Sequence, residues 1–170
     1  MIRIGVIADT HGCLHPQVAH CFAGVERIIH AGDIGGLSVL SELERIAPVI
    51  AVRGNYDLEP ELQDRLLPDP SPLELFSVSA LLTHRLLSVD WESHRELLAE
   101  LILSRLPTLD LFIFGHTHFP VLEKIKGLCF VNPGYCGPDR LEGDPTVAVL
   151  EIEGREISGR IIRLSDAEDG

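Results

Sequence analysis

The sequence predicts an α/β fold with two stacked mixed β-sheets flanked by helices. In the first half of the 170-residue chain, short β-branched runs alternate with amphipathic segments, the pattern of βαβ units around a parallel sheet. The second half is richer in short strands and contains two predicted hairpins. A chain of this length with 45% hydrophobic residues is large enough to bury a core, so a single domain over residues 1–170 is expected.

The first half of the chain alternates strands and helices. Strands are predicted at residues 2–8, 25–30 and 48–52. The helix predicted at 16–23 has proline near its first turn and Gly24 directly after it, both ordinary boundary signals. A second helix is predicted at 38–46, with Ser38 as its N-cap. Each strand is followed by polar or glycine residues, so ligands are expected at the carboxyl ends of the strands.

The second half begins with a proline-rich segment, 58–72, for which a loop with one helical turn is predicted. Strands are predicted at 73–76, 79–83 and 109–114. A helix is predicted at 92–106 because Leu97, Leu98, Leu101 and Ile102 recur at helical spacing before Pro107. Hairpins are predicted at 120–132, turning at Lys126-Gly127, and at 145–164, turning at Glu153-Gly154.

Composition excludes several classes of protein. The net charge of −12 argues against a nucleic acid duplex as partner, because binding phosphates on a surface requires a basic patch. The four cysteines lack CxxC spacing, which favours free thiols over zinc–thiolate or redox sites. No apolar run approaches the length of a membrane span, and no signal peptide is apparent. A cytoplasmic protein with no membrane partner is expected.

The stretch Gly115-His116-Thr117-His118 follows an apolar run that ends at Phe114. On an extended segment, side chains at positions i and i+2 point the same way. Both imidazoles can therefore face one cavity, and neutral imidazole is a common metal ligand. A pair of surface histidines is the alternative, and the choice depends on whether other ligand-type residues follow other strands.

Such residues do follow four further apolar runs. The complete set of ligand-type residues at strand ends is Asp9, His11, Asp33, Asn55, His84, His116 and His118. The ends of strands along one sheet edge converge in space, so these seven side chains are expected to form one cluster. Seven oxygen and nitrogen ligands without sulfur exceed the needs of one tetrahedral zinc. They fit two ions of manganese, iron, zinc or nickel.

The order of these motifs resembles the calcineurin-like metallophosphoesterase family. The matching segments are Asp9-x-His11, Gly32-Asp33, Gly54-Asn55-x-Asp57, His84 and Gly115-His116-x-His118. The short chain and the Asn132-Pro133-Gly134 segment resemble the small bacterial and archaeal phosphodiesterase branch. The resemblance implies a metallophosphoesterase-like αββα sandwich with metals between the strand ends.

The resemblance also implies roles for individual residues. Asp9, His11 and His118 would hold one divalent ion, and Asn55, His84 and His116 the other, with Asp33 bridging. A metal-bridging hydroxide would attack phosphorus, and manganese is the preferred metal. Arg53 is the candidate contact to substrate phosphate. Asp57 would orient Asn55 or another ligand.

Two departures from the family pattern bear on the substrate. Many phosphatases of the family have histidine after the asparagine, proposed to protonate the leaving group, whereas this chain has Tyr56. Tyrosine is a poor acid at neutral pH, so substrates with good leaving groups are expected. The small branch often has His-Gly-His where this chain has His84-Arg85-Leu86, and Arg85 is expected to cover the surface.

The predicted function is therefore a dinuclear metal-dependent phosphoesterase, with diesters favoured over monoesters. Its partner would be a small phosphate-ester substrate, and a homo-oligomer is left open. A nucleotide phosphatase is one alternative. The alternative from another class is a binding scaffold, because a eukaryotic retromer subunit resembles this family yet uses the fold mainly to bind partners. Loss of ligands would favour the scaffold, and all seven ligand residues are present here.

Overall fold

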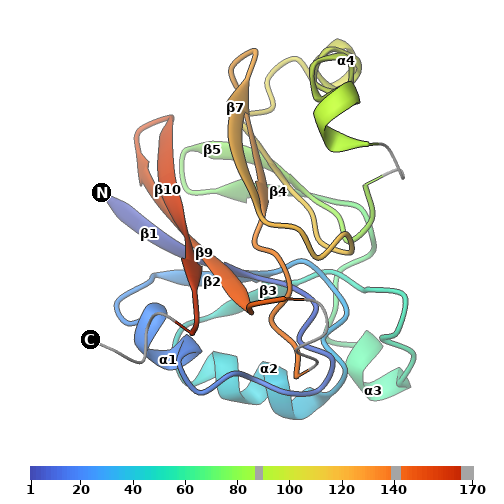
Figure 1. Cartoon of the computed structure of the whole chain (residues 1–170), viewed down its shortest axis with the longest axis vertical. Coiled ribbons are helices and arrows are strands. Elements are labelled where there is room, and N and C mark those ends of the chain that lie inside the picture. The colour runs from blue at the N-terminus through green and yellow to red at the C-terminus, as the bar shows by residue number, and fades with distance from the viewer. Residues whose placement is uncertain (87–89, 139–142, 166–170) are drawn as a thin grey trace.

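The computed structural model describes residues 1–86, 90–138 and 143–165, and its strands form two five-stranded sheets. The first sheet has the order β10-β9-β1-β2-β3 (Figure 1). Its strands are β1 (Ile2–Ile7), β2 (Arg27–His30), β3 (Val49–Ala51), β9 (Thr146–Glu153) and β10 (Glu156–Arg163). Strands β1, β2 and β3 are parallel, and the hairpin of β9 and β10 extends the sheet with β9 antiparallel to β1.

The second sheet has the order β4-β5-β6-β8-β7. Its strands are β4 (Ser71–Leu75), β5 (Val78–Leu82), β6 (Leu111–Ile113), β7 (Val121–Ile125) and β8 (Leu128–Asn132). Its three central strands, β5, β6 and β8, are parallel, and a hairpin closes each edge. The carboxyl ends of β5 and β6 therefore lie at one edge of this sheet, as those of β1, β2 and β3 do in the first.

Four helices cover the outer faces of the two sheets (Figure 1). They are α1 (Val18–Cys21), α2 (Leu37–Glu44), α3 (Pro60–Gln63) and α4 (Trp91–Arg105). One buried cluster lies between the sheets, a second packs α1, α2 and α3 against the first sheet, and a third packs α4 against the second sheet. The prediction of two stacked mixed sheets flanked by helices is confirmed.

Strand β1 shows how the sequence produces this layering. Successive strand residues point to opposite faces, so Ile4 and Val6 enter the cluster between the sheets while Ile7 enters the cluster under the helices. Gly5 leaves space for the Phe22 ring, whose atoms lie 2.9 Å from where a Cβ at position 5 would stand. A strand covered on both faces has no polar side, which explains why β1 is apolar from Ile4 to its end.

Two local predictions were wrong. The helix predicted at 16–23 is a single turn, Val18–Cys21, because the N–H of Ala23 bonds to the carbonyl of His20 in a tighter turn. The N-cap of α2 is Gly36 rather than Ser38, which lies inside the helix and makes no capping bond. The helix predicted at 92–106 is confirmed as α4, in which Leu98 and Ala99 are buried while Leu97 and Leu101 are exposed.

The described part of the chain contains no helix of the length and apolar character needed to cross a membrane. All four cysteines are free; Cys13 is exposed, and Cys21, Cys129 and Cys136 are buried. The prediction of free, mostly buried thiols is confirmed.

Candidate metal centre

The seven predicted ligand residues all follow the carboxyl ends of parallel strands. Asp9 and His11 follow β1, Asp33 follows β2, Asn55 follows β3, His84 follows β5, and His116 and His118 follow β6. The first three strands belong to one sheet and the last two to the other. Six of the seven form two compact groups in which the ligand atoms lie within 4.8 Å of one another.

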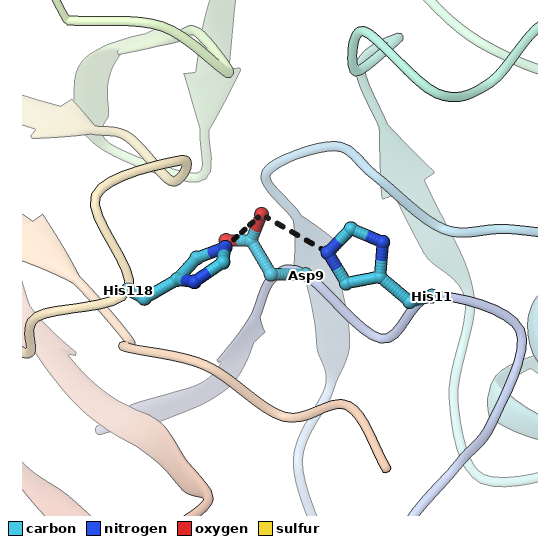
Figure 2. A group of neighbouring side chains, drawn as sticks. All are labelled: Asp9, His11 and His118. Atoms are coloured by element: carbon cyan, nitrogen blue, oxygen red, sulfur yellow. Dashed lines mark ion pairs between the residues drawn. The ribbon is translucent and has the colours of Figure 1, made fainter. Parts of the chain in front are cut away.

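The first group consists of Asp9, His11 and His118 (Figure 2). Asp9 Oδ1 lies 3.4 Å from His118 Nε2 and 4.0 Å from His11 Nε2. The Asp9 carboxylate is fully buried, and Oδ2 accepts a hydrogen bond of 3.1 Å from the N–H of His116, whereas Oδ1 has no hydrogen-bond partner. A buried carboxylate oxygen without a partner carries a large desolvation cost. A cation between this oxygen and the two imidazoles would remove that cost, so these residues fit a metal ion.

The second group consists of Asp33, His84 and His116. His84 Nδ1 lies 2.8 Å from the carbonyl of Ala31 and must donate to it, since a carbonyl only accepts. His84 Nε2 then faces two further acceptors, Asn55 Oδ1 at 2.9 Å and Asp33 Oδ2 at 3.3 Å. Three electron-pair donors therefore converge at one point. Either a proton on Nε2 or a metal cation satisfies them.

The electrostatics of the second group favour a bound cation. Burial works against protonation of His84, but hydrogen bonds to Asp33 and Ala31 outweigh it and raise the pKa of His84. Burial would raise the pKa of Asp33, but hydrogen bonds from His84 and the Tyr56 N–H outweigh it and lower that pKa. Burial, assisted by the charges of His84 and Arg85, lowers the pKa of His116. The group thus combines an ionised carboxylate with a neutral His116, both suitable ligands.

The backbone at most of these residues is in the left-handed region. Five of the seven have positive φ, between 45° and 66°: Asp9, His11, Asp33, His116 and His118. Non-glycine residues in this region are strained and persist only where their surroundings hold them. Here two strand-end loops brace each other, because the N–H groups of Asp9 and His11 each donate at 3.0 Å to the carbonyls of Gly32 and Asp33.

Glycines allow the loops to approach this closely. A Cβ at Gly54 would lie 2.0 Å from the amide nitrogen of Asp33, and one at Gly32 would lie 2.6 Å from His84 Nδ1. A Cβ at Gly115 would lie 2.8 Å from the carbonyl oxygen of Ala31. The glycine of each family motif therefore serves a direct steric purpose, since side chains at these positions would displace the ligand residues.

The other two predicted catalytic residues, Asp57 and Arg53, differ in burial: Asp57 is buried and Arg53 is exposed. Asp57 is fully buried, and its carboxylate accepts from the N–H groups of Gly35 at 3.0 Å and Gly54 at 2.8 Å, so it holds the loop that carries Asn55. Arg53 is exposed and donates to Gln63. Its role as a phosphate contact stays a prediction.

Tyr56 and Arg85 both lie beside the candidate ligands. Tyr56 is 67% exposed, and its ring centroid lies 5.7 Å from that of His11 in an edge-on arrangement. Arg85 Nε lies 3.4 Å from His116 Nε2. The guanidinium expected to cover the surface thus contacts a ligand imidazole while remaining exposed.

Sequence reasoning missed several residues that support the ligands. Asn132 Nδ2 donates to the Gly115 carbonyl at 3.1 Å and to Thr117 Oγ1 at 2.9 Å, holding the loop that carries His116 and His118. The Tyr135 ring is buried 4.9 Å from the His118 ring. Asp69 Oδ1 accepts from the backbone N–H of His84 at 2.9 Å. The Asn-Pro-Gly turn was the only sequence signal for any of these contacts.

The buried side chains of His30 and Thr10 connect the loops that follow β1 and β2. Thr10 Oγ1 donates to the Ile34 carbonyl at 2.9 Å, so it accepts from His30 Nε2, also at 2.9 Å. His30 Nδ1 is then an unprotonated nitrogen, which explains how it can be buried without a partner. This buried pair ties the loop after β1 to the loop after β2.

A family model for the calcineurin-like phosphoesterase superfamily domain matches residues 2–155. The chain belongs to this superfamily. A probable metallophosphoesterase of Methanothermobacter thermautotrophicus is 35% identical over 94% of this chain and 91% of the relative. A phosphodiesterase of Methanocaldococcus jannaschii is 31% identical over 91% of this chain and 96% of the relative. This superfamily membership confirms the sequence-based prediction of a metallophosphoesterase.

Solved structures of calcineurin-like phosphoesterase fold agree with this chain over nearly its whole length. That of a novel archaeal phosphodiesterase has a TM-score of 0.68 at 26% identity, covering 95% of this chain and all (100%) of the other. Vps29 of Entamoeba histolytica, solved in complex with zinc, has a TM-score of 0.71 at 22% identity, covering 96% and 99%. The Vps29 likeness concerns the fold alone.

Proposed function

We propose that this calcineurin-like phosphoesterase is a dinuclear metal-dependent phosphodiesterase. The observation that carries the proposal is the pair of ligand groups, one around Asp9 and one around Asp33, at the facing strand ends of the two sheets. Each group combines an aspartate with two histidines, a donor set suited to manganese, iron, zinc or nickel. The fit is supported by the unpartnered Asp9 Oδ1 and by the acceptors around His84 Nε2.

Within this proposal, Asp9, His11 and His118 would hold one ion and Asn55, His84 and His116 the other, with Asp33 serving both. Asp33 Oδ1 accepts from the Tyr56 N–H at 2.9 Å, and its Oδ2 faces His84. Manganese would be the preferred metal. Two divalent ions held in this way would supply an activated water and neutralise negative charge on phosphate. The chain's own task is to hold the ligands rigidly and to receive the substrate.

The residues around the ligand groups favour diesters with good leaving groups. A phosphodiester carries one negative charge and a monoester close to two, and Arg85 is the cationic side chain that contacts the ligands among the described residues. Tyr56 takes the position at which an imidazole acid would stand, so the leaving group must depart without strong acid assistance. Tyr56, 67% exposed beside His11, offers an aromatic surface to an aryl or base-like leaving group.

The test is hydrolysis of bis(4-nitrophenyl) phosphate beside 4-nitrophenyl phosphate, with Mn²⁺ and with a chelator. We expect metal-dependent hydrolysis, faster for the diester, that falls to background in Asp33→Asn. The matched control is Glu100→Gln, which removes one carboxylate charge from the exposed surface of α4 and should leave the rate unchanged. Elemental analysis after soaking in Mn²⁺ should find two ions per chain.

Two outcomes would overturn the proposal. No hydrolysis of either ester under any condition, with metal still bound, would favour the scaffold alternative. Faster hydrolysis of monoesters, nucleoside monophosphates included, would favour the nucleotide phosphatase alternative.

A further inference from the structure

A pocket lies on the helix-covered side of the first sheet, away from the candidate metal centre. Its volume is about 570 Å³, within the range of small-molecule sites. The residues that line it come from β1, from α1 and the turn after it, and from β10: Arg3, His20, Cys21, Ala23, Arg160, Ile161, Ile162 and Arg163. Figure 1 shows β1, α1 and β10 gathered on one side of the molecule.

Strand alternation directs two arginines toward this pocket. Ile2 and Ile4 pack toward the cluster between the sheets, so Arg3 between them lies on the opposite, helix-covered face. In β10, Ile161 packs toward the same inter-sheet cluster, and Arg160 therefore also lies on the helix-covered face. The pairings of β1 and β10 with β9 place these two residues on the same small region of the sheet.

The charge of this pocket is opposite to that of the protein. The chain has a net charge of −12, yet three arginines line the pocket and no aspartate or glutamate does. None of the three arginines forms an ion pair with a carboxylate of the described residues. Arg3 and Arg160 share the helix-covered face, and their positive charges favour an anion as the ligand there.

Arg3 is the part of this pocket that is already organised for a ligand. Its Nη1 donates to the carbonyl of Ala23 at 3.2 Å, which fixes the guanidinium at the end of α1. Its Nε is buried and has no hydrogen-bond partner. A buried, unpartnered N–H on a cationic group is costly unless an acceptor completes it.

The pocket is separate from the metal centre. Arg3 lies at the start of β1, and Asp9 lies six residues later, beyond the other end of this extended strand. At roughly 3.3 Å per residue the two are about 20 Å apart. A ligand here is therefore not the substrate of the metal centre in the same binding event.

We propose that this pocket binds a small organic molecule that carries a phosphate monoester. Arginine forks match the geometry of phosphate oxygens and form charge-assisted hydrogen bonds with them. A phosphate monoester is close to doubly charged at neutral pH, which suits a site with the two guanidiniums of Arg3 and Arg160 on one face. Orthophosphate alone would leave most of 570 Å³ unfilled, whereas the apolar side chain of Ile162 suits an apolar or flat organic group.

The proposal is tested by isothermal titration calorimetry of the full chain. EDTA in the buffer removes metal ions, so phosphate cannot bind through them. Adenosine 5′-monophosphate is the probe, with adenosine and inorganic phosphate as comparisons. We expect the nucleotide to bind with a Kd below 1 mM, and both comparisons to bind at least tenfold more weakly. Arg160→Gln, at an exposed position that tolerates substitution, should weaken binding at least tenfold.

The matched control is Arg105→Gln, which makes the same change of charge at an exposed position at the end of α4 and should leave the Kd unchanged. Circular dichroism confirms that each variant is folded. The proposal is overturned if no binding is detected at 10 mM nucleotide, or if Arg105→Gln weakens binding as much as Arg160→Gln does. Equal affinity for orthophosphate and nucleotide would overturn the proposal that the ligand carries an organic group. None of these readouts depends on phosphodiesterase activity, so failure here leaves the proposed function standing.

Discussion

Gly32→Ala separates the backbone requirement of the candidate metal centre from its steric requirement. Gly32 has φ +91°, and a Cβ there would lie 2.6 Å from His84 Nδ1 and 2.8 Å from His84 Cβ. Gly127, in the turn between β7 and β8, has nearly the same φ of +89°, but a Cβ there would meet nothing within 4 Å. The two substitutions share a conformational cost and differ in the displacement of one imidazole.

The magnitudes follow from these two surroundings. The left-handed conformation costs an alanine about 1–2 kcal/mol relative to glycine, and this is the expected destabilisation by Gly127→Ala. In Gly32→Ala the methyl group must also push the buried His84 ring away from the Ala31 carbonyl, which adds about 1–3 kcal/mol of overpacking. The total is about 2–5 kcal/mol. Displacing His84 should also weaken metal binding by the Asp33 group.

The assays are urea unfolding of the metal-free protein and calorimetric titration with Mn²⁺. Gly127→Ala should bind Mn²⁺ as the unmodified protein does, whereas Gly32→Ala should lose at least tenfold in affinity for one of two ions. Equal destabilisation by the two substitutions, together with unchanged Mn²⁺ affinity in Gly32→Ala, would refute the argument that this glycine is needed to seat His84.

Three further predictions concern the residues that support the centre. Burial lowers the pKa of His30 to about 3. Below pH 6.5 the unfolded chain therefore binds a proton that the folded protein does not. The free energy of unfolding consequently falls by up to about 1.4 kcal/mol per pH unit from pH 6.5 toward 3. His30→Gln should remove this share of the slope in urea unfolding measured between pH 7.5 and 5.5. Asn132→Ala frees the loop of His116 and His118 and should lower Mn²⁺ affinity in calorimetry, with unaltered affinity arguing against its positioning role. Asp57→Asn places an amide N–H against a backbone N–H and should cost about 1–3 kcal/mol of unfolding free energy.

Much of the fold was predictable because each strand carries its own local signal. β1 is apolar apart from Arg3 and β8 apart from its last residue, Asn132, and the turn at Lys126-Gly127 has positive φ at both residues, as a tight hairpin requires. Ser38 was assigned wrongly because a good capping residue also occurs two positions inside a helix whose backbone start is set by Gly36. The helical spacing around Leu98 predicted α4, but it does not reveal that Leu98 faces the sheet while Leu97 and Leu101 face solvent.

The candidate ligands were predictable for a different reason. Parallel strands bring their carboxyl ends to one edge, so polar residues directly after several strands must meet there. Asp69 carried no such signal: it lies in a proline-rich loop, and only the folded chain brings it to the N–H of His84. Tyr135 likewise reaches His118 only through the turn after β8.

The sequence by itself determined which side chains can bind a cation and that they follow strand ends, because both properties are local. Tertiary structure decided the partition into two ligand groups, the unpartnered oxygen of Asp9 and the placing of Arg3 and Arg160 beside one pocket. These features depend on contacts between segments far apart in the chain, whose separation after folding no local pattern encodes.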